Sequence, residues 1–62
     1  MNKYEIYQVG KLPPLTVVEA ATYTIDNGFL TFYMNQQYHK DSCIAKFNFN
    51  NIAGFKRVQD ND

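Results

Sequence analysis

The chain has 62 residues, enough for one small domain, and its five Phe and five Tyr are too many aromatic residues for a disordered tail. Six basic residues balance six acidic ones, so no net charge draws the protein to nucleic acid or to an anionic membrane. No apolar run approaches the roughly 18 residues that span a bilayer, and no secretory segment precedes the first charges, so we expect a cytoplasmic protein without membrane contact.

The first expected strand covers residues 3–9, where each face carries a mixture of apolar and polar side chains, and Gly10 breaks the run. Pro13 and Pro14 follow, and neither can donate a hydrogen bond to a β ladder. We expect a rigid connector or a sheet edge at this point.

The second and third strands are expected at residues 17–25 and 29–34. β-Branched residues flank the centre of the first of these segments and favour a strand, although a short helix over residues 15–23 stays the alternative. Gly28 supplies the positive φ that a three-residue hairpin needs, and Asn27 also tolerates it. The two segments therefore predict a β-hairpin.

Side chains of a strand alternate between its two faces, so the third strand predicts two different surfaces. One face carries Leu30, Phe32 and Met34, with Tyr23 and Ile25 continuing it across the hairpin, and we expect it to face the core. The other face carries Phe29, Thr31 and Tyr33 and is expected to point outward.

A polar loop at residues 35–42 separates the hairpin from a fourth strand at residues 43–49, in which Ala45, Phe47 and Phe49 are expected to share a face. Residues 50–54 predict a turn or one helical turn with Asn50 or Asn51 as its N-cap. A fifth strand at residues 55–58 and a frayed tail at 59–62 complete the chain. We expect one all-β domain over residues 1–62, a small antiparallel meander of about five strands that forms a curved sheet or a partly open barrel.

Catalysis needs a nucleophile beside a base, a pair of carboxylates in different environments, or a metal ion. Cys43 and His39 are the only cysteine and histidine, no acid has a fixed spacing to them, and the thiol is expected to be buried. These two residues are too few for a zinc site, and one cysteine forms no disulfide within the chain. We expect a non-enzyme without metal or cofactor, and because so small a core is marginal, a homo-oligomer, most simply a dimer.

Exposed aromatic residues in a contiguous patch mark interaction surfaces. The sequence therefore predicts a protein-binding module, whose partner-binding residues are the outward hairpin face and the tip of the polar loop: Phe29, Thr31, Tyr33, Tyr38, His39 and Lys40. A symmetry mate could cover the same face instead of a partner. The alternative is a small barrel that binds single-stranded nucleic acid through surface aromatics and the cations Lys46, Lys56 and Arg57.

The segment 18–58 resembles small β-rich proteins encoded by bacteriophages and prophages. The resemblance rests on a strand pair around a D-x-G-like turn, followed by an A-x-F strand and a short last strand: Tyr23, Gly28, Leu30, Phe32, Ala45 and Phe47. Some small phage proteins bind and block a host protein, including host defence proteins. The resemblance implies an inhibitor that acts by stoichiometric binding in the host cytoplasm.

Overall fold

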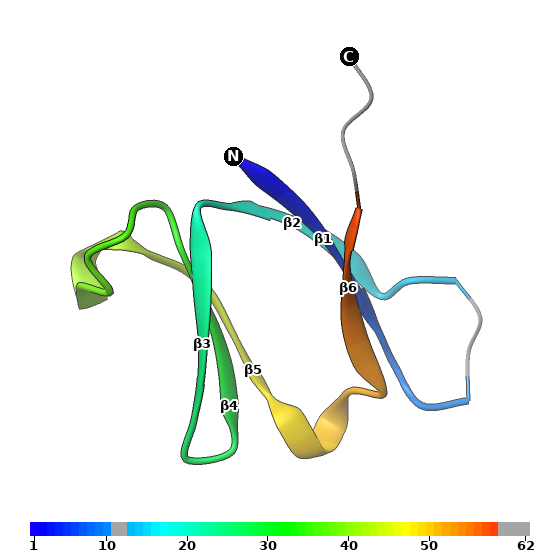
Figure 1. Cartoon of the computed structure of the whole chain (residues 1–62). Coiled ribbons are helices and arrows are strands. Elements are labelled where there is room, and N and C mark those ends of the chain that lie inside the picture. Colours follow the sequence, from blue (N-terminus) through cyan, green and yellow to red (C-terminus); the bar gives the residue numbers. More distant parts are fainter. Residues whose placement is uncertain (11–12, 59–62) are drawn as a thin grey trace.

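The computed structural model describes residues 1–10 and 13–58, which form two three-stranded antiparallel sheets (Figure 1). The first sheet has the order β2-β1-β6 and consists of β1 (Asn2–Tyr7), β2 (Thr16–Ala20) and β6 (Gly54–Val58). The second has the order β3-β4-β5 and consists of β3 (Thr22–Asp26), β4 (Phe29–Tyr33) and β5 (Cys43–Asn48). Two 3₁₀ turns, η1 (Lys40–Ser42) and η2 (Phe49–Asn51), flank β5.

The predicted all-β antiparallel class is confirmed, but the predicted single meander of about five strands is wrong. The described residues form six strands in two sheets, and these sheets are not closed into a barrel. The tail predicted at 59–62 lies outside the described residues. In the described part of the chain, η1 and η2 are the helical segments, and neither is long and apolar enough to cross a membrane.

The strand expected at residues 17–25 is divided at Ala21, where the chain passes from one sheet to the other. Ala21 donates its N–H to the carbonyl of Tyr33 at 2.9 Å, and its carbonyl lies 3.4 Å from the side-chain amides of both Asn2 and Gln36. Because the backbone polar groups at the corner have partners, the bend leaves none unsatisfied. The helix alternative for residues 15–23 is wrong, since β-branched residues hold both halves extended.

The hairpin between β3 and β4 is confirmed, with a two-residue turn rather than the expected three-residue one. Asp26 pairs directly with Phe29, which leaves Asn27 (φ 53°) and Gly28 (φ 79°) as the turn. Two consecutive positive φ values define a type I′ turn, whose twist matches that of the flanking strands.

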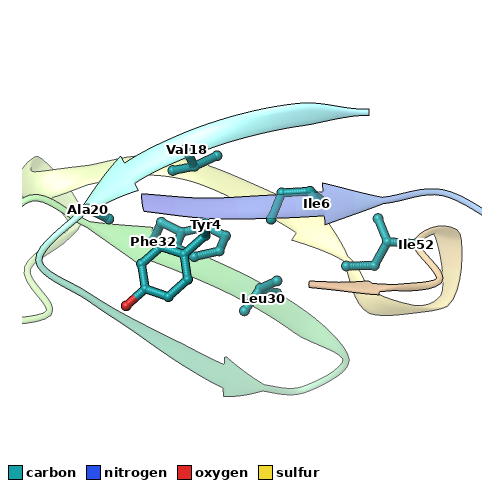
Figure 2. Packing of buried hydrophobic residues seen from close by; sticks show 7 residues of the cluster. All are labelled: Tyr4, Ile6, Val18, Ala20, Leu30, Phe32 and Ile52. Carbon is teal, nitrogen blue, oxygen red and sulfur yellow. The ribbon is translucent and has the colours of Figure 1, made fainter. Parts of the chain in front are cut away.

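The core lies between the two sheets and contains side chains from both (Figure 2). Its buried apolar members are Tyr4, Ile6, Val18, Ala20, Leu30, Phe32 and Ile52. Phe32 is fully buried, and its ring centroid lies 5.0 Å from that of Tyr4 and 6.1 Å from those of Phe47 and Phe55. Both sheets are therefore stabilised by the same small set of packed rings and aliphatic side chains.

The predicted core face of β4 is confirmed for Leu30 and Phe32 and is wrong for Met34, which is 50% exposed because the strand ends one residue earlier. Phe49 likewise leaves the face it was expected to share with Phe47, because it begins η2 and is exposed. The N-cap of η2 is Asn48, two residues before the nearer of the two expected positions, and its side chain accepts a hydrogen bond from the Asn50 N–H at 3.0 Å.

The outer face of the first sheet carries two lysines and two glutamates, and we call it the charged face: Lys3, Glu5, Tyr7, Val17, Glu19, Lys56 and Val58. Opposite charges occupy paired positions, Lys3 opposite Glu19 and Glu5 opposite Lys56. Opposite charges directly across antiparallel strands are the favourable arrangement. The hydroxyl of Tyr7 donates a hydrogen bond to the Glu5 carboxylate.

Candidate protein-binding face

The outer face of the second sheet differs in composition from the charged face, and we call it the groove face: Thr24, Asp26, Phe29, Thr31, Tyr33 and Lys46. Because Leu30 and Phe32 point into the core, alternation places Phe29, Thr31 and Tyr33 on the opposite side of β4. The register then sets Thr24 of β3 and Lys46 of β5 on either side of Thr31.

An open groove of about 260 Å³ runs over this face. It is lined by Thr24, Asp26, Asn27, Phe29, Thr31, Tyr33 and Lys46. The two threonines occupy the middle row of the strand register, and the aromatic side chains of Phe29 and Tyr33 flank that row. The face therefore offers hydroxyl groups between two rings, with a cation on one border and a carboxylate near the turn.

Thr31 points outward as predicted but is only 8% exposed, so the expectation that it stands in water is wrong. It lies on the central strand, with Lys46 beside it on β5 and the larger rings of Phe29 and Tyr33 before and after it on the same face, which explains its burial. Thr31 can still form the bottom of the groove, whereas Phe29 and Tyr33 present the accessible ring surface.

Lys46 is held locally by an aromatic ring. Its amino nitrogen lies 4.5 Å from the centroid of the Phe29 ring, a cation–π contact that bridges β4 and β5. Contacts of this kind are worth about 0.5–1 kcal/mol at exposed sites. This contact fixes one wall of the groove.

Tyr38 joins the polar loop to the groove face. Its ring meets that of Tyr33 edge to face, with centroids 5.5 Å apart and an interplanar angle of 85°. The loop is closed at its base by a hydrogen bond from the Met34 N–H to the Ser42 carbonyl at 2.8 Å. Tyr38 adopts a left-handed backbone conformation (φ 55°) and remains half exposed. Two separately predicted parts of the site thus meet at the Tyr33–Tyr38 pair.

His39 and Lys40 lie beside Tyr38 in the chain, but the structure gives His39 a capping role in the loop. Its Nδ1 accepts a hydrogen bond from the Asp41 N–H at 3.2 Å and lies 3.5 Å from the Asp41 carboxylate. Lys40 begins η1 and is exposed. Neither residue lines the groove, so both lie at the border of the candidate face.

Four groove residues were missed by sequence reasoning as parts of a protein-binding site: Thr24, Asp26, Asn27 and Lys46. The signal for Thr24 was present, since a two-residue turn at 27–28 places it opposite Thr31. Lys46 was assigned only to the nucleic-acid alternative. Its place beside Thr31 depends on the register of β5, which a β-bulge between Phe32 and Tyr33 shifts by one residue.

The three cations of the nucleic-acid alternative lie on two different sheets. Lys46 is on the groove face, whereas Lys56 and Arg57 are neighbours on β6 and so point to opposite sides of the first sheet. The described cations therefore do not line one continuous groove for a phosphate backbone.

Cys43 is exposed at the start of β5, so the expected buried thiol is wrong. An edge strand with a bulge beside it does not enclose this side chain, whose sulfur lies 3.9 Å from the carbonyl of Ala45. No cluster of three or more His, Cys, Asp or Glu able to hold a metal ion occurs within residues 1–10 and 13–58.

Comparison with protein-family models, with curated proteins and with solved structures found no significant match to this chain.

Proposed function

We propose that this protein is a non-enzymatic binding module whose protein partner docks on the groove face. The observation that carries the proposal is the Tyr33–Tyr38 ring pair, which joins the hairpin and the loop into one aromatic border beside the groove. The core needs none of these rings, because its side chains lie on the other side of β4. Accessible Tyr and Phe at a hollowed surface are typical of binding hot spots.

The size of the groove favours a protein partner over a small-molecule ligand. Its volume of about 260 Å³ lies below the roughly 300–1,000 Å³ of typical ligand pockets. It suits one side chain of a partner, held between Phe29 and Tyr33, with its polar end near the hydroxyls of Thr24 and Thr31. Other contacts would spread over Tyr38 and the border residues His39 and Lys40.

The resemblance to small phage-encoded β proteins gives a more particular form of the proposal. In that form the partner is a host or defence protein in the cytoplasm, and the module inhibits it by occupying one of its surfaces stoichiometrically. This form is supported by the resemblance alone, whereas the docking face is supported by the geometry of the groove.

The experiment compares three single variants as immobilised baits in bacterial lysate, with quantitative mass spectrometry of the retained proteins. Tyr38→Ala and Phe29→Ala change the groove face, and Tyr7→Ala removes a tyrosine from the charged face as the matched control. We expect one protein to be retained by the wild type and by Tyr7→Ala, and to be depleted about tenfold or more by each groove variant, as for loss of a hot spot.

The same baits separate the proposal from nucleic-acid binding. If oligonucleotides bind the wild type appreciably, and this binding falls steeply with added salt, the nucleic-acid alternative replaces the proposal. Equal retention of all proteins by the four baits would contradict a partner on the groove face.

A further inference from the structure

The second sheet has a free edge at β3, which forms one border of that sheet (Figure 1). In a two-residue hairpin the residues next to the turn, Asp26 and Phe29, exchange both backbone hydrogen bonds. Alternation then directs the backbone groups of Thr24 and Thr22 toward β4. The N–H and C=O groups of Tyr23 and Ile25 consequently point away from the sheet, toward solvent.

Three of the four edge strands in the described part of the chain carry a feature that opposes pairing with another strand. β2 has Glu19 within it, β5 has Lys46 and a bulge beside it, and β6 has Lys56 and Arg57. Charges and bulges of this kind are how proteins protect sheet edges. β3 reads Thr-Tyr-Thr-Ile-Asp, and its single charge is at its end.

The edge strand also exposes apolar side chains. Tyr23 and Ile25 lie on the core side of β3 yet are 39% and 52% exposed. Their neighbours across the hairpin, Phe32 and Leu30, are fully buried. The Tyr23 ring contacts those of Tyr4 and Phe55, with centroids 5.7 and 4.9 Å away, and its remaining surface is exposed together with Ile25.

We infer that two copies of the chain pair through this edge, with β3 of one copy antiparallel to β3 of the other about a two-fold axis at Thr24. This register sets Tyr23 opposite Ile25 of the second copy, and the reverse, so that their free backbone groups form four hydrogen bonds. On the core side the exposed part of each Tyr23 ring lies beside Ile25 of the other copy, and on the outer side Thr24 meets Thr24. The inference does not depend on the proposed function.

The distribution of charge on the edge strands favours β3 over β6 as the strand that pairs with a second copy. In this register Asp26 lies opposite Thr22, so no like charges meet. The corresponding pairing of β6 about its central residue would set Lys56 against Lys56. A two-fold contact uses the same residues on both copies, and β3 is complementary to itself in this sense.

The contact involves five residues on each copy, fewer than the about 20–30 residues a side of a stable interface. The dimer is therefore in concentration-dependent equilibrium with the monomer. It forms a six-stranded sheet in which the two groove faces lie side by side on the same surface.

Disulfide trapping tests both the pairing and its register. Thr24→Cys is made in a Cys43→Ser background, because Thr24 faces itself at a Cα separation of about 4.5 Å, within disulfide range. Thr22→Cys in the same background is the matched control, since two copies of residue 22 are about 13 Å apart in this register. We expect mild oxidation to cross-link most of the first variant and little of the second.

Substitutions that add a charge at position 24 provide a second test, in which self-association of the folded chain is measured. Sedimentation equilibrium should show that Thr24→Lys and Thr24→Glu each weaken self-association about tenfold, because like charges meet on the axis. An equimolar mixture of the Thr24→Lys and Thr24→Glu variants should restore association, because opposite charges then meet on the axis. Circular dichroism establishes that both variants are folded, and Thr16→Lys on β2 is the control for an added charge.

Absence of cross-linking together with a monomer at all concentrations would overturn the inference. Equal cross-linking at positions 22 and 24 would overturn the register and indicate another contact. Self-association that Thr24→Lys and Thr24→Glu both leave unchanged would place the interface away from β3.

Discussion

The two outer faces of this protein rest on the same core but have opposite characters. On the charged face, Lys3 lies opposite Glu19 and Glu5 opposite Lys56, so that charges of opposite sign occupy paired positions. On the groove face, two aromatic rings flank a row of threonines, and a third ring extends the border from the loop. A face whose charges are balanced internally suits contact with water, whereas ring surface left half exposed gains free energy when a partner covers it.

The largest effect is expected from breaking the core that supports both faces. Phe32→Ala should cost about 3–5 kcal/mol of unfolding free energy, because it removes the fully buried ring at the centre of the aromatic cluster. A core of this size supplies only about 3–5 kcal/mol in total, so the variant should be largely unfolded at 25 °C by circular dichroism. Met34→Ala is the control, and it should cost little because Met34 is half exposed. A native-like urea transition for Phe32→Ala would contradict this account of the core.

A change in the hairpin turn should weaken the groove face more than the charged face. Gly28→Ala should cost about 1–2 kcal/mol, because Gly28 has a left-handed backbone conformation (φ 79°) that disfavours a Cβ, although the added Cβ would meet no atom within 4 Å. Native-state amide exchange should accelerate in β3 and β4 more than in β1 and β6. Asn27→Gly keeps the turn geometry and should leave the exchange pattern close to that of the wild type. Equal acceleration of amide exchange in both sheets would show that the hairpin does not open separately from the rest of the protein.

Removal of one lysine from each face compares the groove face and the charged face through smaller changes in unfolding free energy. Lys46→Ala should lower the unfolding free energy by about 0.5–1 kcal/mol through loss of its contact with the Phe29 ring. Lys56→Ala on the charged face should change it by less than about 0.5 kcal/mol, since exposed charge pairs contribute little. Urea denaturation of both variants in low and high salt measures the difference. Equal losses would mean that the ring contact adds nothing to the stability of the groove face.

The smallest effect concerns the pH dependence of the charged face. The hydrogen bond that Tyr7 donates to Glu5, together with burial and the negative charge of Glu5, raises the pKa of the Tyr7 hydroxyl above its ordinary value. Because the pKa is raised in the folded state, the contribution to stability is complete below the ordinary tyrosine pKa of about 10 and is lost as the pH rises through the folded value. Thermal unfolding between neutral pH and strongly alkaline pH should therefore show a steeper alkaline loss for the wild type than for Tyr7→Phe. Parallel curves would contradict a role for this hydrogen bond.

The sequence predicts individual strands better than it predicts how they are arranged. The alternation of side chains over residues 29–33 correctly indicates that Leu30 and Phe32 are buried, because a period of two follows from strand geometry alone. The division into two sheets was missed because alanine at the corner interrupts no run of β-formers. A phase change in the side-chain alternation does mark the corner. The even-numbered residues Val18 and Ala20 lie on the core side of β2, whereas the odd-numbered residues Tyr23 and Ile25 lie on the core side of β3.

The candidate site was predicted in parts, and its assembly depends on contacts that no local pattern encodes. Phe29, Tyr33 and Tyr38 were predicted from composition and alternation, and the structure places the last two in contact. The burial of Thr31 and the position of Lys46 depend on the neighbours of β4 and on a bulge. His39 and Lys40 were predicted as residues at the tip of the polar loop, and the structure leaves them outside the groove.

The phase change at Ala21 has a consequence for how the chain tolerates changes in length. One residue added to or removed from this corner would turn β3 over, so that Tyr23 would leave the rings of Tyr4, Phe32 and Phe55 and the threonines of β3 would replace it on the core side. The polar loop at residues 35–42 lies outside both sheets and tolerates an extra residue far better. Variation in length among related chains is therefore expected in that loop and excluded from the corner.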